Sequence, residues 1–98
     1  MAKCPTLTKE MLNAPVELNV GGGGLDYYRA REIADTKARE MSAAPMLLAW
    51  YDRVSGERSP KVESCNSKKP GWLVYAESRG GNIAIDINNE DYVFVYMG

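Results

Sequence analysis

The sequence contains no histidine, which removes the commonest general base and the commonest metal ligand of proteins. It has only two cysteines, Cys4 and Cys65, which lie far apart and form no CxxC pair. That spacing is not typical of a zinc or iron–sulfur site. We therefore predict no metal and no cofactor.

Long apolar runs are also missing. No stretch approaches the roughly 18 apolar residues that cross a bilayer, and the N-terminal residues lack the apolar block of a secretory signal. Nor is there an excess of one charge, because 12 Lys and Arg oppose 13 Asp and Glu and leave a net charge of −1. These absences predict a cytoplasmic protein without membrane contact and argue against nucleic acid as a partner.

The composition that is present is that of an ordinary folded domain. Apolar residues make up 45% of the 98 residues and charged residues 26%. A chain of this length forms one hydrophobic core. We expect a single domain over residues 1–98, with residues 1–14 as a loose N-terminal arm.

One segment has the apolar spacing of an amphipathic helix. Within residues 26–41 the apolar side chains recur at helical intervals, as Tyr27, Ala30, Ile33, Ala34, Ala38 and Met41. The three alanines would let this helix lie close against a sheet. On its outer face, Asp35 is spaced to pair with Arg31 and with Arg39.

The rest of the chain has strand character. Alternation and aromatic enrichment predict strands at residues 15–20, 46–52, 72–78, 82–87 and 92–97, and an edge strand within 57–63. Short turns join the last three, which we expect to be sequential antiparallel neighbours. The predicted fold class is α+β, with one amphipathic helix packed on a mixed, mainly antiparallel sheet of about five strands.

The last two strands suggest a sheet with two different faces. One face is predicted to be aliphatic, with Ile83, Ile85 and Ile87 from the first strand and Val93, Val95 and Met97 from the second. We expect the helix to pack on this face. The reverse face then carries the aromatic row Tyr92, Phe94 and Tyr96. A second copy, a ligand, the N-terminal arm or strong twist would have to cover it. We predict a homodimer whose interface is this row.

Four glycines at residues 21–24 precede the helix, which is a setting for phosphate binding. The dinucleotide and P-loop patterns both fail, and Asp26 is placed to cap the helix in a phosphate's stead. A neutral or zwitterionic ligand stays open as an alternative. It would use the backbone at Gly22, Gly23 and Gly24, with Tyr28 and Arg31 beside it.

Two further candidates stand at predicted strand ends. Asp52 closes one strand, and Glu77 and Arg79 close another. If these ends meet, the three side chains form a polar pocket in which a buried carboxylate serves as acid or base. The alternative is a surface ion pair beside a turn.

Several segments together suggest a family. They are GGGGLDYYRAR, PMLLAWYD, GERSP, PGWLVYAESRG and YVFVY, which span nearly the whole chain. The sequence resembles a small prokaryotic family of uncharacterised α+β domains of roughly 100 residues. The resemblance implies a fold class and a prokaryotic, cytoplasmic origin, but no catalytic residues.

Two functions follow from these patterns. The first is a non-catalytic binding or assembly module that homodimerises through the aromatic sheet face. The alternative is a cofactor-free enzyme or small-ligand-binding protein with a site near the glycine-rich loop, drawing on Tyr28, Arg31, Asp52 or Arg79. An enzyme predicts a concave site where a carboxylate, a tyrosine and an arginine converge, whereas a module does not.

Overall fold

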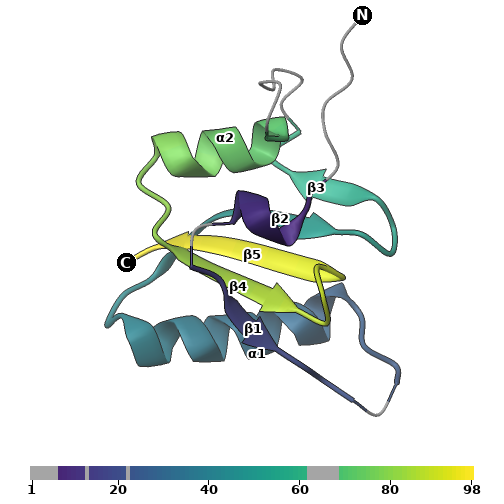
Figure 1. Ribbon diagram of the computed structural model, residues 1–98. Helices are drawn as coiled ribbons and strands as arrows, with labels where there is room; N and C mark the ends of the chain where they lie inside the picture. The colour runs from purple at the N-terminus through teal and green to yellow at the C-terminus, as the bar shows by residue number, and fades with distance from the viewer. Residues whose placement is uncertain (1–6, 13, 22, 62–68) are drawn as a thin grey trace, which may run out of the picture.

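The computed structural model describes residues 7–12, 14–21, 23–61 and 69–98. One five-stranded sheet lies between two α-helices, with α1 on one face and α2 on the other (Figure 1). The elements are a 3-10 turn η1 (Lys9–Met11), β1 (Val16–Leu18), α1 (Tyr27–Met41), β2 (Met46–Asp52), β3 (Glu57–Ser59), α2 (Gly71–Ser78), β4 (Ile83–Ile87) and β5 (Tyr92–Met97).

The strand order is β1-β4-β5-β2-β3. β1 runs parallel to β4, and the other neighbours are antiparallel. The predicted α+β class with a mixed, mainly antiparallel sheet is therefore confirmed. β3 lies at an edge, as expected for the segment 57–63, although residues 62–68 lie outside the described part of the chain. Cys4 and Cys65 also lie outside it.

α1 begins and ends where local chemistry places it. The Asp26 carboxylate accepts a hydrogen bond from the backbone N–H of Arg29 at 2.9 Å, which satisfies one of the free donors of the first turn. After Met41 the backbone becomes extended at Ser42, and Pro45 follows. The predicted cap and the predicted helix are both confirmed.

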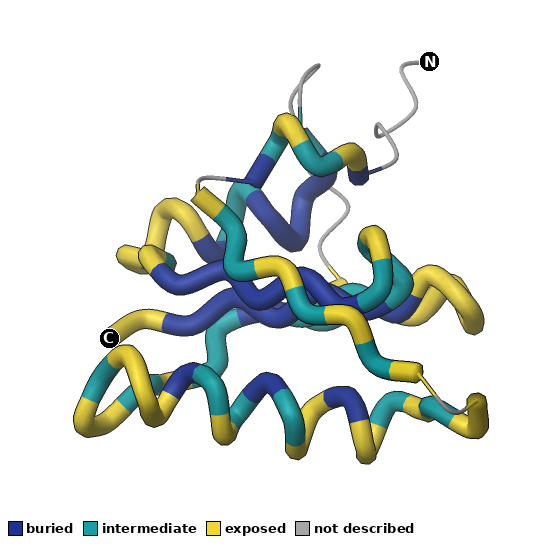
Figure 2. Tube along the Cα trace, turned by 60° about the horizontal axis from the view of Figure 1, so that its bottom comes forward, coloured by how far each residue is buried: buried dark blue, intermediate teal, exposed yellow. Residues whose placement is uncertain are grey.

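Small side chains bring α1 close to the sheet. Ala30, Ala34 and Ala38 are fully buried, while the outer face of the helix is exposed (Figure 2). They pack with the three isoleucines of β4 and with side chains of β5. Because alanine has no side chain beyond Cβ, the helix backbone approaches the sheet directly.

The aromatic row is not on the face that we predicted. Tyr92, Phe94 and Tyr96 are only 4%, 0% and 2% exposed, and they lie under α1 with the isoleucines of β4. The cause is register: the turn after β4 pairs Ile87 with Tyr92 and Ile85 with Phe94, and opposite residues of antiparallel strands share a face. The prediction that these three rings form a dimer interface is wrong, since the same chain already covers them.

Residues 71–78 form a helix, not a strand. Gly71, Trp72, Leu73 and Ala76 are the buried residues of α2, which packs on β2 and β5. The expected helix count of one is therefore wrong, and the second sheet face has its own cover. The segment is apolar around its whole circumference, so a strand pattern and a buried-helix pattern cannot be told apart by periodicity.

The segment before β1 is not a loose arm over its described part. Leu7 and Leu12 are buried in the core cluster beneath α2, together with Trp72, Leu73 and Val93. Thus α2 and residues 7–12 together cover the face opposite α1 (Figure 2). The described part of this segment includes the 3-10 turn η1.

Asn88 ties the end of β1 to the β4–β5 turn. Its side-chain oxygen accepts the N–H of Val20 at 2.7 Å, and its amide nitrogen donates to the Val20 carbonyl at 3.1 Å. The backbone N–H of Asn88 also donates to the carbonyl of Leu18 at 2.9 Å. These three bonds fix the short edge strand to its neighbour.

Gly81 lets α2 approach β5 closely. A Cβ at this position would lie 2.8 Å from a methyl group of Val95 and 2.9 Å from the carbonyl oxygen of Ala76. The Gly81 N–H donates to that same carbonyl at 2.9 Å, which ends the helix. Only glycine fits without a shift of backbone or core.

We expect Gly81→Ala to lower the free energy of unfolding by about 1–3 kcal/mol, the usual cost of overpacking. Gly21→Ala is the matched control, because nothing lies within 4 Å of a Cβ placed at Gly21. Urea denaturation followed by circular dichroism measures both. Equal stabilities of the two variants would contradict the close-contact argument.

Candidate functional site

The glycine-rich loop serves as a bend before the capped helix. Gly23 and Gly24 have φ of +70° and +67°, a left-handed conformation that favours glycine, and a Cβ on either would meet nothing within 4 Å. Gly22 lies outside the described residues. Tyr28 beside the loop is 80% exposed, and its ring meets Tyr27 edge-on with 5.4 Å between the ring centroids. The loop is held by the Tyr92 hydroxyl, which donates to the Leu25 carbonyl at 3.3 Å.

Asp52 and Arg79 do not meet. Asp52 is paired in register with Tyr92 at the start of β5, whereas Gly80, next to Arg79, lies against Met97 at its end. The length of β5 separates them by about 17 Å. Asp52 accepts the N–H of Ser55 at 3.2 Å, and Arg79 stacks on the Tyr75 ring, with the guanidinium 5.0 Å from the ring centroid. The predicted pocket is therefore not formed.

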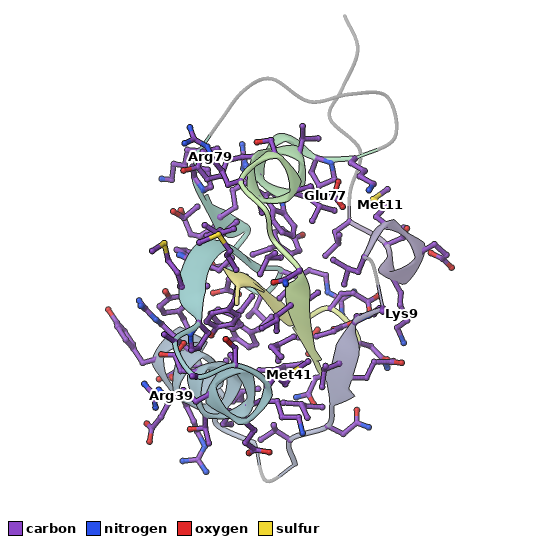
Figure 3. The ribbon with its side chains drawn as sticks, turned by 90° about the vertical axis from the view of Figure 1, so that its left-hand side faces the viewer. Lys9, Met11, Arg39, Met41, Glu77 and Arg79 are labelled. Carbon is purple, nitrogen blue, oxygen red and sulfur yellow. The ribbon has the colours of Figure 1, made fainter. Side chains whose placement is uncertain are left out.

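Glu77 does not join Asp52 in a pocket either. It forms an ion pair with Lys69 at 2.8 Å. Figure 3 shows Glu77 on α2 and Arg79 at its C-terminal end, on the opposite side of the molecule from α1. Glu77 lies in the last turn of α2 and Arg79 caps its C-terminus, so the strand end on which the predicted pocket depended does not exist there.

A small polar pocket lies on one flank of α1. It has a volume of about 130 Å³ and is lined by Arg31, Asp35, Arg39, Pro45, Leu47 and Tyr96. Arg39 lies on the side of α1 away from β1 (Figure 3). The buried Tyr96 hydroxyl donates to Asp35, and the Arg31 guanidinium lies 3.7 Å from the same carboxylate. A carboxylate, a tyrosine and an arginine therefore do converge here. Of these three residues, only Arg31 was among the predicted ligand-binding residues.

Two of the pocket groups, Tyr96 and Arg31, are held in their ordinary charge states. Burial, then the hydrogen bond to Asp35, raises the pKa of Tyr96, so its phenol stays protonated. The hydrogen bond that the Arg31 guanidinium donates to the Tyr27 hydroxyl, together with the nearby Asp35, raises the pKa of Arg31, so its guanidinium stays charged. The expected pair of Asp35 with Arg39 is not formed. None of these shifts prepares an acid or a base for neutral pH.

A larger groove runs along the other flank of α1, next to β1. Its volume is about 480 Å³, and its lining residues are Leu18, Arg29, Glu32, Ile33, Thr36, Lys37 and Glu40. Leu18 and Ile33 are half-buried and form an apolar floor, while four charged side chains form the rim. β1 itself is an edge strand with a neighbour on one side only. This concave surface was not predicted, because it needs the position of β1 relative to α1.

A buried carboxyl pair lies on the opposite face of the sheet. Asp86 of β4 is 1% exposed, and its Oδ1 accepts the N–H of Glu90 at 2.6 Å. Its Oδ2 and the Glu90 Oε2 are buried and have no hydrogen-bond partner among the residues that the structure describes. The turn that returns Glu90 to Asp86 has three successive left-handed residues, Asn88, Asn89 and Glu90.

Burial, and then the neighbouring Glu90 carboxyl, raise the pKa of Asp86 to about 6. Lys9 of η1 offsets part of this charge, because its ammonium lies 4.0 Å from Glu90 and also pairs with Glu17. The sequence signal was available in the single acid within the apolar run IAIDI. Its position between two covered faces was not.

The part of the chain that the structure describes contains no group of three or more acidic or cysteine side chains arranged to hold a metal ion. Among its helices, none combines the length and the apolar character of a bilayer span. The described residues form a small α+β domain whose surface includes the groove and the polar pocket beside α1 and whose interior includes the buried carboxyl pair.

Comparison with known proteins places this domain. Residues 13–96 match a family described as a domain of unknown function (DUF5619), and the chain belongs to that family. The resemblance to a small uncharacterised prokaryotic family is thereby confirmed.

An uncharacterized protein of the archaeon Archaeoglobus fulgidus is 39% identical over 49 residues. That match covers 50% of this chain and 52% of the relative, so it spans about half the length of the curated relative. A crystal structure of the protein AF1514 from the same species superimposes with a TM-score of 0.70 at 28% identity, over 84% of this chain and 89% of the other.

The carboxyl pair makes stability depend on pH. Because the pKa of Asp86 is raised above its value of 3.8, its contribution to stability is fully present below pH 4 and is lost as the pH rises through about 6. An amide at this position keeps the acceptor for the Glu90 N–H and cannot ionise.

We expect Asp86→Asn to be more stable than the wild type by about 1–3 kcal/mol at pH 7.5, with the difference shrinking toward pH 4.5. Thermal unfolding at both pH values measures this. Glu57→Gln, which alters an exposed ion pair with Lys61, is the control. A difference between Asp86→Asn and wild type that stays the same at both pH values would refute the buried-acid assignment.

Proposed function

We propose that the protein is a non-catalytic assembly module that forms a homodimer through the groove between α1 and β1. The single observation that carries this proposal is the groove itself, with its volume of about 480 Å³, its apolar floor and its charged rim. A concave apolar surface bordered by polar residues has the anatomy of a protein interface. The aromatic row of β5 is no longer a candidate, because α1 covers it.

The edge strand supports the same side of the domain. β1 is short and lies at the margin of the sheet, where backbone groups are open to another chain. Leu18 lies on this strand and also lines the groove. A partner seated in the groove would therefore cover the sheet edge and the flank of α1 together.

The chemistry of the other candidate sites supports a non-catalytic role. In the polar pocket the Tyr96 phenol is held protonated and Asp35 is compensated by Arg31. The one carboxyl with a pKa raised toward neutrality, Asp86, is 1% exposed beneath the residues that cover the second face. A general acid or base must reach its substrate, and this carboxyl faces protein on all sides.

Binding of a small ligand is the second candidate function, and the polar pocket favours it. Arg31 and Arg39 flank a volume of about 130 Å³, which admits a charged group of only a few atoms such as a carboxylate. In a thermal-shift titration with simple carboxylates, a rise in Tm for the wild type that is lost in Arg39→Ala would support this candidate. No rise in the wild type would reject it.

We expect the wild type to sediment as a dimer and Ile33→Asp to dissociate it at least tenfold more readily, because the new carboxylate would be buried in the apolar floor. Val54→Asp is the matched control, since Val54 is 72% exposed and lies outside the groove lining. Analytical ultracentrifugation over a concentration series measures the dissociation constant. A wild type that stays monomeric at the highest concentration would reject the proposed function.

A further inference from the structure

The charges along the groove have a definite order on α1. Six of the lining residues belong to this helix, and along the chain they are basic, acidic, apolar, polar, basic and acidic: Arg29, Glu32, Ile33, Thr36, Lys37 and Glu40. Two positive and two negative side chains balance one another. A rim without net charge attracts neither nucleic acid nor an acidic surface. Its charges instead favour a partner whose own charges have the opposite sign at each facing position.

This order is symmetric about the middle of α1. The midpoint lies between residues 34 and 35, and each lining residue has a counterpart at the same distance on the other side. Arg29 corresponds to Glu40, Glu32 to Lys37, and Ile33 to Thr36. Each charged residue thus has a counterpart of opposite sign.

We propose that α1 pairs antiparallel with α1 of a second copy about a two-fold axis through the middle of the helix, so that Arg29 faces Glu40 and Glu32 faces Lys37 of the other copy. This inference rests on the homodimer proposed above and specifies its geometry. In a two-fold interface each contact occurs twice, so the two kinds of pair give four pairs of opposite charge. A parallel pairing would instead place each charge opposite its own kind.

The ion pairs within one chain leave part of this pattern unused. Lys37 and Glu40 lie 3.5 Å apart within the same helix. Arg29 and Glu32 have no ion-pair partner among the described residues, although both lie on the groove. Their charges are therefore available to a second copy without breaking a contact in the first.

The apolar and charged parts of the surface have different tasks. Exposed ion pairs contribute little affinity, but like charges brought together oppose association and select orientation. Leu18 and Ile33 on the floor supply the apolar area that is removed from water. The charges then determine the relative orientation of the two helices in the dimer.

Two double variants test this geometry. Arg29→Glu with Lys37→Glu makes the rim wholly acidic, and Glu32→Lys with Glu40→Lys makes it wholly basic. Each variant alone should dimerise at least tenfold more weakly than the wild type, because only like charges meet. An equimolar mixture should restore a one-to-one heterodimer with an affinity close to that of the wild-type homodimer.

The control is Arg58→Glu with Lys61→Glu, which makes the same charge change at exposed positions outside the groove lining. This variant should dimerise as the wild type does. If either double variant loses its helical circular dichroism, the single variants Arg29→Glu and Glu40→Lys repeat the test, since they face one another in the proposed dimer. Both also favour the helix dipole, with an acid near the N-terminus and a base near the C-terminus.

The outcomes separate the two proposals. A monomeric wild type rejects the homodimer and with it this geometry. A wild-type dimer that Ile33→Asp disrupts, but whose acidic and basic variants still dimerise separately or fail to recover on mixing, rejects the antiparallel geometry alone. Recovery only in the mixture supports it.

Discussion

The close contact between the alanines of α1 and the sheet determines where the long side chains of this helix lie. Ala30, Ala34 and Ala38 are fully buried against the isoleucines of β4 and the aromatic side chains of β5. A helix that lies this close has no room for large side chains beneath it. Its long charged residues are therefore displaced to its two flanks, where they line the polar pocket and the groove.

The two faces of the sheet are covered in different ways. α1 covers one with a single regular stripe, whereas α2 and residues 7–12 share the other. Asp86 is buried on this second face, so the ionisable group lies beneath the face that two separate segments cover. The groove lies at the β1 edge, next to the regular half, and combines a rigid helix with a short strand that three hydrogen bonds fix in place. An interface built on such elements needs little rearrangement when a partner binds.

The sequence predicted those parts of the fold that depend on local signals. The cap at Asp26, the alanine spacing and the alternation in β4 and β5 each act within a few residues, and all were confirmed. The helix α2 was missed because Trp72 to Ala76 are apolar on every side, and only the need to cover the second sheet face distinguishes helix from strand. The face of the aromatic row depends on one residue of register in a four-residue turn, which composition does not determine.

The candidate sites were predictable only in part, for a related reason. Arg31 was singled out, and Asp35 is its neighbour along the helix, but Tyr96, which donates to Asp35, lies 61 positions away along the chain and reaches it only through the fold. The paired charges of the groove are visible along the chain once the flank is known, yet nothing in the sequence identifies that flank before β1 is placed. The predicted pocket of Asp52 and Arg79 is not formed because residues 71–78 form the helix α2 in place of the expected strand.

The bridge between Asn88 and Val20 makes the sheet edge sensitive to chemical ageing. Asparagine side chains lose their amide slowly, and here the amide donates to one backbone group and its oxygen accepts from another. Deamidation would leave a carboxylate facing the Val20 carbonyl, two acceptors without a hydrogen between them. The strand that borders the groove would then keep only two of the three hydrogen bonds that fix it to its neighbour, and its attachment would weaken over the lifetime of the molecule.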